Sequence, residues 1–223
     1  MEMKIDKIIK SKRKSIALEV NDNAELVARV PKRFNKKVLQ EFLNSKSQWL
    51  KNMQKEMRRQ LQLSQRNFKS GETFFYLGKE YRLKIQSNTS SLYLDNNFFY
   101  LPKNQKNQAA ELFVDWYKQS ARNIFTQRVS VYQKKYNFKI NKIKLSSARK
   151  RWGSCSSQRN LNFAWRLVMA PLFVIDYIVV HELVHLKYMN HSKRFWCMVE
   201  NIYPDYKEAE KWLKENSYKL KFF

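Results

Sequence analysis

The sequence contains few of the residues that break or crosslink a chain. Its 223 residues include 3 glycines, 4 prolines and 2 cysteines. Two cysteines are too few for a disulfide framework, and Cys155 and Cys197 do not have the spacing of a CxxC metal motif. Long apolar runs are also missing: none approaches about 18 residues, the length that a membrane helix requires, and residues 1–14 lack the apolar core of a secretory signal. We therefore expect a cytoplasmic protein without a membrane partner.

Glycine is scarce enough that each one is informative. The three glycines, at positions 71, 78 and 153, leave most turns to Asn, Asp and Ser. In such a chain a glycine indicates a backbone position that a side chain would block, and we expect Gly153 to occupy one. Hydrophobic residues still make up 43% of the chain and aromatic residues 15%, which excludes a disordered chain and provides for a buried core.

All three histidines of the chain lie within residues 181–191, in the pattern HExxHxxxxxH. On a helix, His181 and His185 are one turn apart and project from the same face, with Cβ atoms roughly 6 Å apart, so their imidazoles can bind one ion. Glu182 leans over the same face, within reach of water at the ion rather than of the ion itself. Three protein ligands leave one position open for water, which is typical of hydrolytic zinc sites. The pattern therefore predicts a zinc hydrolase site.

The third ligand is expected to be His191, with Glu200 as the alternative, because some zinc enzymes take a downstream glutamate. The histidine spacing matches the metzincin pattern, in which a glycine at the eighth position lets the chain turn toward the metal. Tyr188 holds that position here, so we expect the turn at Asn190, since asparagine tolerates the left-handed conformation. The competing interpretation is a solvated helix with ordinary surface histidines, but the apolar run Val174–Val180 favours a buried helix.

Charge in this sequence is strongly one-sided, with a net value of +25. Residues 1–105 hold 22 basic and 10 acidic residues and residues 106–223 hold 22 and 9, so no single tail carries the excess. A surface this basic attracts polyanions, which makes nucleic acid a candidate partner. The stretch Lys32–Lys69 is the candidate footprint, and its few aromatic residues favour phosphate contact over base stacking. An equally weighted alternative is that lysine simply covers solvated helix faces.

Apolar periodicity indicates an α+β protein in two parts, a small β-rich N-terminal domain over residues 1–105 and a second domain over residues 106–223. The polar segment 103–107 marks the expected boundary. In chain order, the expected elements are a strand pair in 15–30, one long or broken helix in 35–65, hairpins in 74–85 and 92–101, a helix in 109–125, strands in 140–145 and 161–166, and the histidine helix.

Seven short segments form a specific combination: Gly71-Glu72, Tyr76–Tyr81, Arg151–Cys155, Trp165–Leu167, Ala170-Pro171, Asp176–Leu183 and Asn190–Trp196. Together they resemble the bacterial YgjP-like metallopeptidase family, over nearly the whole chain. The resemblance implies a zincin-like metalloprotease domain, zinc held by His181, His185 and His191, Glu182 as the catalytic residue, and a protein or peptide substrate. The family is related to SprT-like and spartan-type proteases, some of which act on proteins crosslinked to DNA.

The chemistry expected of this site is metal-assisted hydrolysis. Zinc held by three neutral imidazoles would acidify water, and Glu182 would take the proton as the water attacks a polarised carbonyl. The carbonyl oxygen that becomes negative needs a partner, for which Arg149, Arg151 and Tyr188 are candidates. By resemblance to zincins, an exposed edge strand beside the metal helix would pair with extended substrate, and Leu161–Trp165 is the candidate strand.

Two other functions fit parts of the pattern. A zinc site ringed by lysine and arginine could hydrolyse a phosphoanhydride, as a nucleoside triphosphate pyrophosphatase does, although the sequence has no phosphate-binding glycine loop. The chain could instead be a nucleic-acid-binding module in which zinc only holds the C-terminal part together. The substitution Glu182→Gln separates this module from both enzymes, because it removes turnover and leaves zinc binding and folding intact.

Overall fold

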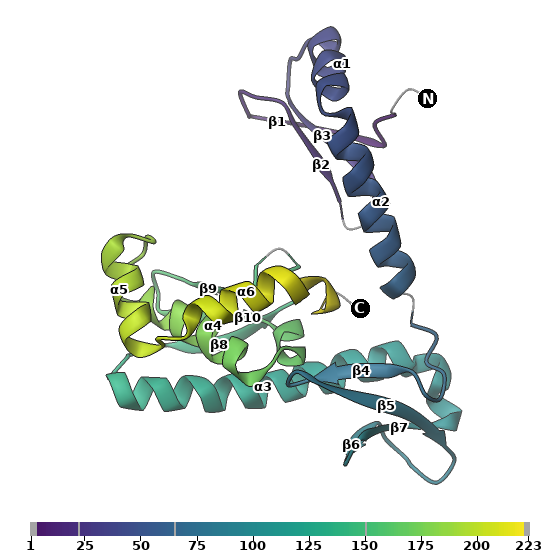
Figure 1. Ribbon diagram of the computed structural model, residues 1–223, viewed down its shortest axis with the longest axis vertical. Helices are drawn as coiled ribbons and strands as arrows, with labels where there is room; N and C mark the ends of the chain where they lie inside the picture. Colours follow the sequence, from purple (N-terminus) through teal and green to yellow (C-terminus); the bar gives the residue numbers. More distant parts are fainter. Residues whose placement is uncertain (1–3, 22, 65, 150, 221–223) are drawn as a thin grey trace. The chain divides into compact units, whose positions relative to one another are not determined.

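The computed structural model describes residues 4–21, 23–64, 66–149 and 151–220 (Figure 1). These residues form α-helices and small sheets, which confirms the α+β class expected from the sequence. The chain divides into two compact units, Met1–Gln65 and Arg66–Phe223.

The first unit contains a three-stranded sheet and two helices. The antiparallel pairing of the second and third strands confirms the strand pair expected in residues 15–30. The first strand, which runs parallel to the third, is a feature that the sequence did not predict. The elements are β1 (Lys7–Ser11), β2 (Ala17–Val20), β3 (Leu26–Pro31), α1 (Lys36–Ser45) and α2 (Ser47–Ser64), and the strand order is β1-β3-β2.

Local chemistry explains where α1 begins and which face it buries. The side-chain oxygen of Asn35 accepts a hydrogen bond from the backbone N–H of Lys37 at 2.8 Å, which caps the helix. Leu39 and Leu43 are one turn apart and are buried in two small apolar clusters shared with the sheet. The helix expected over residues 35–65 is broken at Lys46, where α1 ends and α2 follows.

The second unit begins with a four-stranded sheet whose buried face packs on a long helix. Both hairpins expected in residues 74–101 are present, and aromatic rings fill the interface. The rings of Phe74 on the sheet and Phe113 on the helix, for example, are stacked with centroids 4.1 Å apart. The strands are β4 (Thr73–Tyr76), β5 (Lys79–Gln86), β6 (Tyr93–Asp95) and β7 (Phe98–Pro102), in the order β4-β5-β7-β6; the 3-10 helix η1 (Lys103–Gln108) leads into the long helix α3 (Ala109–Tyr136).

The boundary expected near residue 105 lies inside the second unit, because the β4–β5 turn is anchored much further along the chain. The backbone N–H of Leu77 donates to the carbonyl of Val168 at 2.9 Å, and that of Gly78 donates to Met169 at 3.0 Å. Gly78 has a φ of +79°, and a Cβ atom there would lie 2.7 Å from Cγ of Pro171. The sheet of residues 73–102 is thus fastened to the segment that leads into the histidine helix.

A second, mixed sheet follows α3, and its order corrects one expectation. The strands are β8 (Lys142–Ser146), β9 (Gly153–Cys155) and β10 (Asn160–Ala164), in the order β8-β10-β9. Because β10 has a neighbour on each side, the prediction that Leu161–Trp165 provides an exposed edge strand is wrong. The edge on the side of the histidine helix belongs to β9, which contacts that helix.

Helices complete the second unit. An ion pair joins the histidine helix to α3: Nη2 of Arg128 donates to Oδ2 of Asp176 at 2.8 Å. None of the helices in the described part of the chain has the length and apolarity needed to cross a membrane. The elements after β10 are the 3-10 helix η2 (Trp165–Met169), α4 (Leu172–Val184), which carries the first histidines, α5 (Lys193–Ile202), α6 (Tyr206–Asn216) and the 3-10 helix η3 (Ser217–Leu220).

Candidate metal centre

The histidine helix α4 is buried along most of its length. Every residue from Val174 to Val180 is buried, and the helix contacts α3, α5, α6 and β9. Near its C-terminal end, however, it carries His181 and the buried Glu182. Polar groups inside an apolar core require partners, because their desolvation is otherwise uncompensated. The burial expected from the apolar run is therefore present, and it raises the question of what pairs with these groups.

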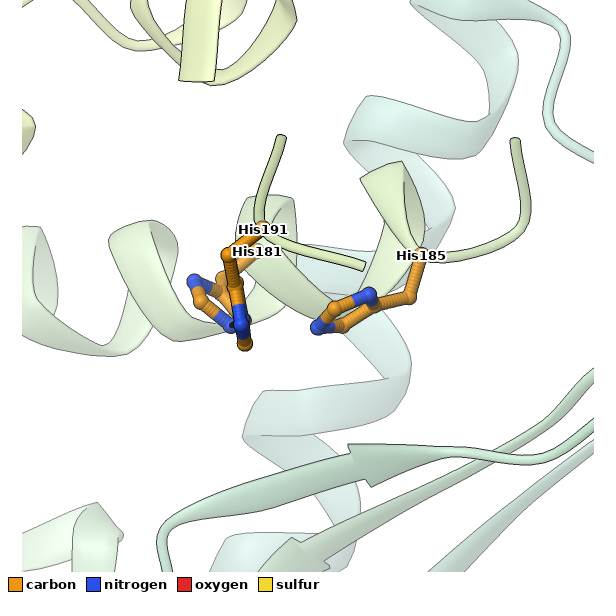
Figure 2. Close-up of side chains that lie close together, drawn as sticks. All are labelled: His181, His185 and His191. Carbon is orange, nitrogen blue, oxygen red and sulfur yellow. Dashed lines mark hydrogen bonds between the residues drawn. The ribbon is translucent and has the colours of Figure 1, made fainter. Parts of the chain in front are cut away.

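The three imidazoles converge on one point (Figure 2). The potential ligand nitrogens of His181, His185 and His191 all lie within 4.8 Å of one another. The Nε2 atoms of His181 and His191 are 3.1 Å apart. His181 lies in the last turn of α4, His185 is the C-cap of that helix, and His191 comes from the segment before α5. The structure thus brings together the three histidines that the sequence spacing singles out.

The turn after α4 orients the second histidine and returns the chain to the third. The N–H of Tyr188 donates to the carbonyl of Val184 at 3.0 Å, and the carbonyl of Tyr188 lies 2.9 Å from Nδ1 of His185. This contact holds the ring so that Nε2 is left for a ligand. None of residues 185–191 has a positive φ, so the prediction of a left-handed Asn190 is wrong. Hydrogen bonds to the end of α4 make the turn instead.

Phe195 of α5 contacts all three imidazoles. The centroid of its ring lies 4.9, 4.6 and 4.8 Å from those of His181, His185 and His191, respectively. The phenyl ring is fully buried, so it forms a rigid apolar floor under the histidines. Sequence reasoning placed Phe195 in the family motif but gave it no role. Its place in the first turn of the helix that follows the third histidine is the signal that could have identified it.

Glu182 lies against the one glycine of β9. A Cβ atom built on Gly153 would be 2.4 Å from Oε1 of Glu182 and 2.6 Å from its Cγ. A side chain at this position would have to displace Glu182, which confirms the expectation that Gly153 occupies a blocked position. The carboxylate of Glu182 therefore lies where α4 meets β9.

The electrostatics of the site fit a cation. Burial, with His185 and His191 adding to it, lowers the pKa of His181 to about 3, so its imidazole is neutral, which is the form that binds metal. Burial raises the pKa of Glu182 to about 8, and the charge of Arg151 acts in the opposite sense. Nδ1 of His181 and Oε2 of Glu182 are buried without a hydrogen-bond partner among the described residues. The converging nitrogen lone pairs of the three histidines are a donor set that a divalent metal ion would satisfy.

The other residues suggested by the sequence have different surroundings. Arg151 is exposed directly before β9 and is near enough for its charge to act on Glu182. Arg149 is half-buried and already has an interaction partner. Tyr188 contributes its main-chain carbonyl. Glu200 is exposed on α5 and, within the described part of the chain, does not join the group of potential ligands that the histidines form.

Cys155, at the end of β9, is close enough to Glu182 for the two to interact electrostatically. Burial, and then the charge of Glu182, raises the pKa of the Cys155 thiol to about 11. The thiol is therefore protonated at neutral pH and is a poor nucleophile.

A family model described as YgjP-like, metallopeptidase domain matches residues 14–216 of the chain. No curated protein and no solved structure matches. The matched range includes all three histidines, Glu182 and Gly153, and it extends through both compact units.

Proposed function

Because the chain belongs to the YgjP-like metallopeptidase family, as its motifs predict, we propose that it is a zinc-dependent peptidase in which Glu182 is the general base. The observation that carries this proposal is the position of Glu182, which is buried directly after the first of three converging histidines and has its carboxylate against Gly153. We also assign a zincin-like arrangement to the second unit, since the histidine helix runs beside the edge strand of a mixed sheet.

The proposed metal ligands are Nε2 of His185 and the facing nitrogens of His181 and His191. Three imidazole ligands for one ion suit zinc and leave its fourth position to water. When bound, zinc would supply Lewis acidity, which polarises the substrate carbonyl and lowers the pKa of water. Phe195 keeps the imidazoles from shifting, because it contacts all three rings.

Glu182 is proposed to take a proton from the attacking water and to pass it to the departing amine. It directly follows His181 in the sequence and is not part of the group of potential ligands, so its proposed role is to act on water at the metal without binding the metal. Gly153 acts on Glu182 as a positioning residue, since the absence of a side chain at this point is what allows the carboxylate to lie there.

We propose that extended substrate pairs with β9 rather than with the strand first expected. β9 is an edge strand in the described sheet, it contacts α4, and it begins at the glycine that touches Glu182. A peptide added to this edge would run past the site with its carbonyl groups aligned by main-chain hydrogen bonds. Substrates would therefore be unfolded or extended segments of proteins.

Arg151 is the proposed partner for the negative charge that develops on the carbonyl oxygen. It is exposed, it immediately precedes β9, and its charge already acts on Glu182. Arg149 has another partner. The part of Tyr188 that contacts the site is its main-chain carbonyl, which is occupied by His185.

The test combines zinc analysis with cleavage of a denatured protein by the full-length chain. We expect about one zinc ion per wild-type chain, and loss of zinc in His191→Ala. Glu182→Gln should keep the zinc and lower turnover by about 1,000-fold, the range seen for removal of a general base. The matched control is Glu200→Gln, which makes the same chemical change at an exposed glutamate and should behave like wild type.

Two results would overturn the proposal. A folded wild-type chain that does not retain zinc would exclude metal-assisted hydrolysis. Hydrolysis of nucleoside triphosphates that depends on Glu182, with no cleavage of denatured protein, would assign the same residues to phosphoanhydride chemistry.

A further inference from the structure

The first unit carries a cluster of open hollows around Phe34. Three hollows, with volumes of about 530, 750 and 490 Å³, all include Phe34 in their lining. Apolar side chains from both the sheet and α1 line them, among them Ile8, Leu39 and Val38. We call this region the Phe34 hollows. Each is large enough to admit a planar ring the size of a nucleobase.

Every charged residue that lines the Phe34 hollows, among the described residues, is basic. The backbone pairing explains why these residues gather: β1 runs parallel to β3 and its last residue, Ser11, is opposite Pro31. The basic segment that includes β1 is therefore brought beside the basic segment that follows β3. Residues 4–14 and 31–43 together hold 10 basic and 2 acidic residues. The charged lining residues are Lys4, Lys10, Lys14, Lys32, Arg33 and Lys36.

The start of α1 adds a second source of positive potential. Its first turn contains no acidic residue and begins with Lys36 and Lys37. Lysine is unfavourable there, because the N-terminal end of a helix already carries partial positive charge. Asn35, which caps the helix, and Lys36 both line the Phe34 hollows. An anion bound at this point would offset the repulsion between these lysines and the positive end of the helix.

Apolar groups in the same region remain open to solvent. Ile8 is 48% exposed and Val38 is 49% exposed. The ammonium group of Lys10 lies 5.8 Å from the centroid of the Phe34 ring, so a cation and an aromatic face are already adjacent. An apolar floor whose charged neighbours are all basic suits a ligand that is anionic along its backbone and flat and apolar in its side groups.

We propose that the Phe34 hollows bind single-stranded nucleic acid, with phosphates at the lysine and arginine side chains and a base against Phe34. A single strand has both the phosphate charge and the unpaired bases that this surface complements. A duplex presents the phosphates but keeps its bases stacked inside, so it would leave the apolar floor uncovered. This inference does not rest on the peptidase proposal, because it concerns residues of the first unit and predicts binding without turnover.

The test measures the affinity of the full-length, zinc-loaded chain for a short thymidine oligonucleotide over a range of salt concentrations. The variant Lys10→Glu/Lys36→Glu should weaken binding by more than about tenfold and lower the slope of log affinity against log salt by about 1 to 2. Because Lys36→Glu also favours the start of α1, loss of folding would not explain this result. The matched control, Lys207→Glu/Lys211→Glu, changes the net charge equally at exposed positions of α6 that line none of the three hollows, and should change affinity less than about threefold.

A third variant tests the proposed contact between a base and Phe34. Phe34→Leu keeps an apolar side chain at this half-buried position and should weaken binding of the single strand by about tenfold, with little effect on a duplex of the same length. Equal losses in the two lysine pairs would show diffuse attraction and overturn the proposal. Duplex binding as tight as strand binding would also overturn it, and so would equally tight binding of polyglutamate, which would assign the hollows to an acidic protein.

Discussion

The two units of this chain place their polar groups in opposite ways. In the second unit, His181 and Glu182 are largely buried and are fixed by neighbours such as Phe195 and Gly153. In the first unit, lysine and arginine side chains stand exposed around Phe34. A reaction requires atoms held within a fraction of an ångström, which close packing provides. Capture of a polyanion requires mainly charge density, which a small unit with modest apolar clusters can present.

Removing the metal should produce the largest difference in stability between the two units. If free zinc is present at about 1,000 times its dissociation constant, its removal by a chelator should lower the unfolding free energy of the second unit by about 4 kcal/mol. Peptidase activity should disappear, and the thermal transition of the first unit should stay in place, because its described residues hold no part of the histidine group. Scanning calorimetry with and without chelator measures both transitions. Equal shifts of the two transitions would contradict a metal site confined to the second unit.

The glycines sharpen the same contrast, since all three lie in the second unit. Gly153→Ala should lower kcat/KM by about 100-fold, because the added Cβ would meet Oε1 of Glu182 at 2.4 Å and displace the carboxylate. Zinc content should be unchanged. Ser154→Ala, one residue further along β9, is the control and should keep most of the activity. A Gly153→Ala enzyme as active as wild type would show that Glu182 can move aside without loss.

Ion pairs give the smallest expected difference between the units. The side chains of Arg128 and Asp176 are 21% and 11% exposed, whereas those of Arg29 and Glu19 in the first unit are 44% and 31% exposed. Asp176→Asn should lower the unfolding free energy by about 2 kcal/mol, because Arg128 is left half-buried without its counter-ion. Glu19→Gln should cost less than about 1 kcal/mol, since water screens the exposed pair. Urea unfolding of both variants measures the difference, and equal costs would contradict the role given to burial.

The histidine segment is the part of the fold that the sequence predicts best, because its geometry is local. His181 and His185 are one helical turn apart whatever surrounds them, and the apolar run before them is enough to predict burial. The hairpins around Gly78 and Asn96 follow from local turn chemistry in the same way. The blocked position of Gly153 could be predicted from the small number of glycines alone, since a glycine-poor chain keeps glycine where a side chain would collide with a neighbour.

Features that depend on pairing between distant segments could not be predicted. β1 is rich in lysine and has no apolar alternation, so only its parallel pairing with β3 reveals it as a strand. β9 is three residues long, and its presence turns β10 from the expected edge strand into a central one. Phe195 contacts the histidines through the packing of α5 on α4, which no local spacing encodes.

The anchoring of the Leu77–Gly78 turn on Val168 and Met169 bears on the order of events during folding. These hydrogen bonds join segments separated by most of the second unit, and contacts of such long range close late, because a long stretch of chain must first be ordered. The segment that leads into the histidine helix would then settle only after the hairpin, α3 and the second sheet have assembled. We expect the metal to enter a nearly finished fold rather than to nucleate it, in contrast to small zinc domains that remain unfolded until the ion binds.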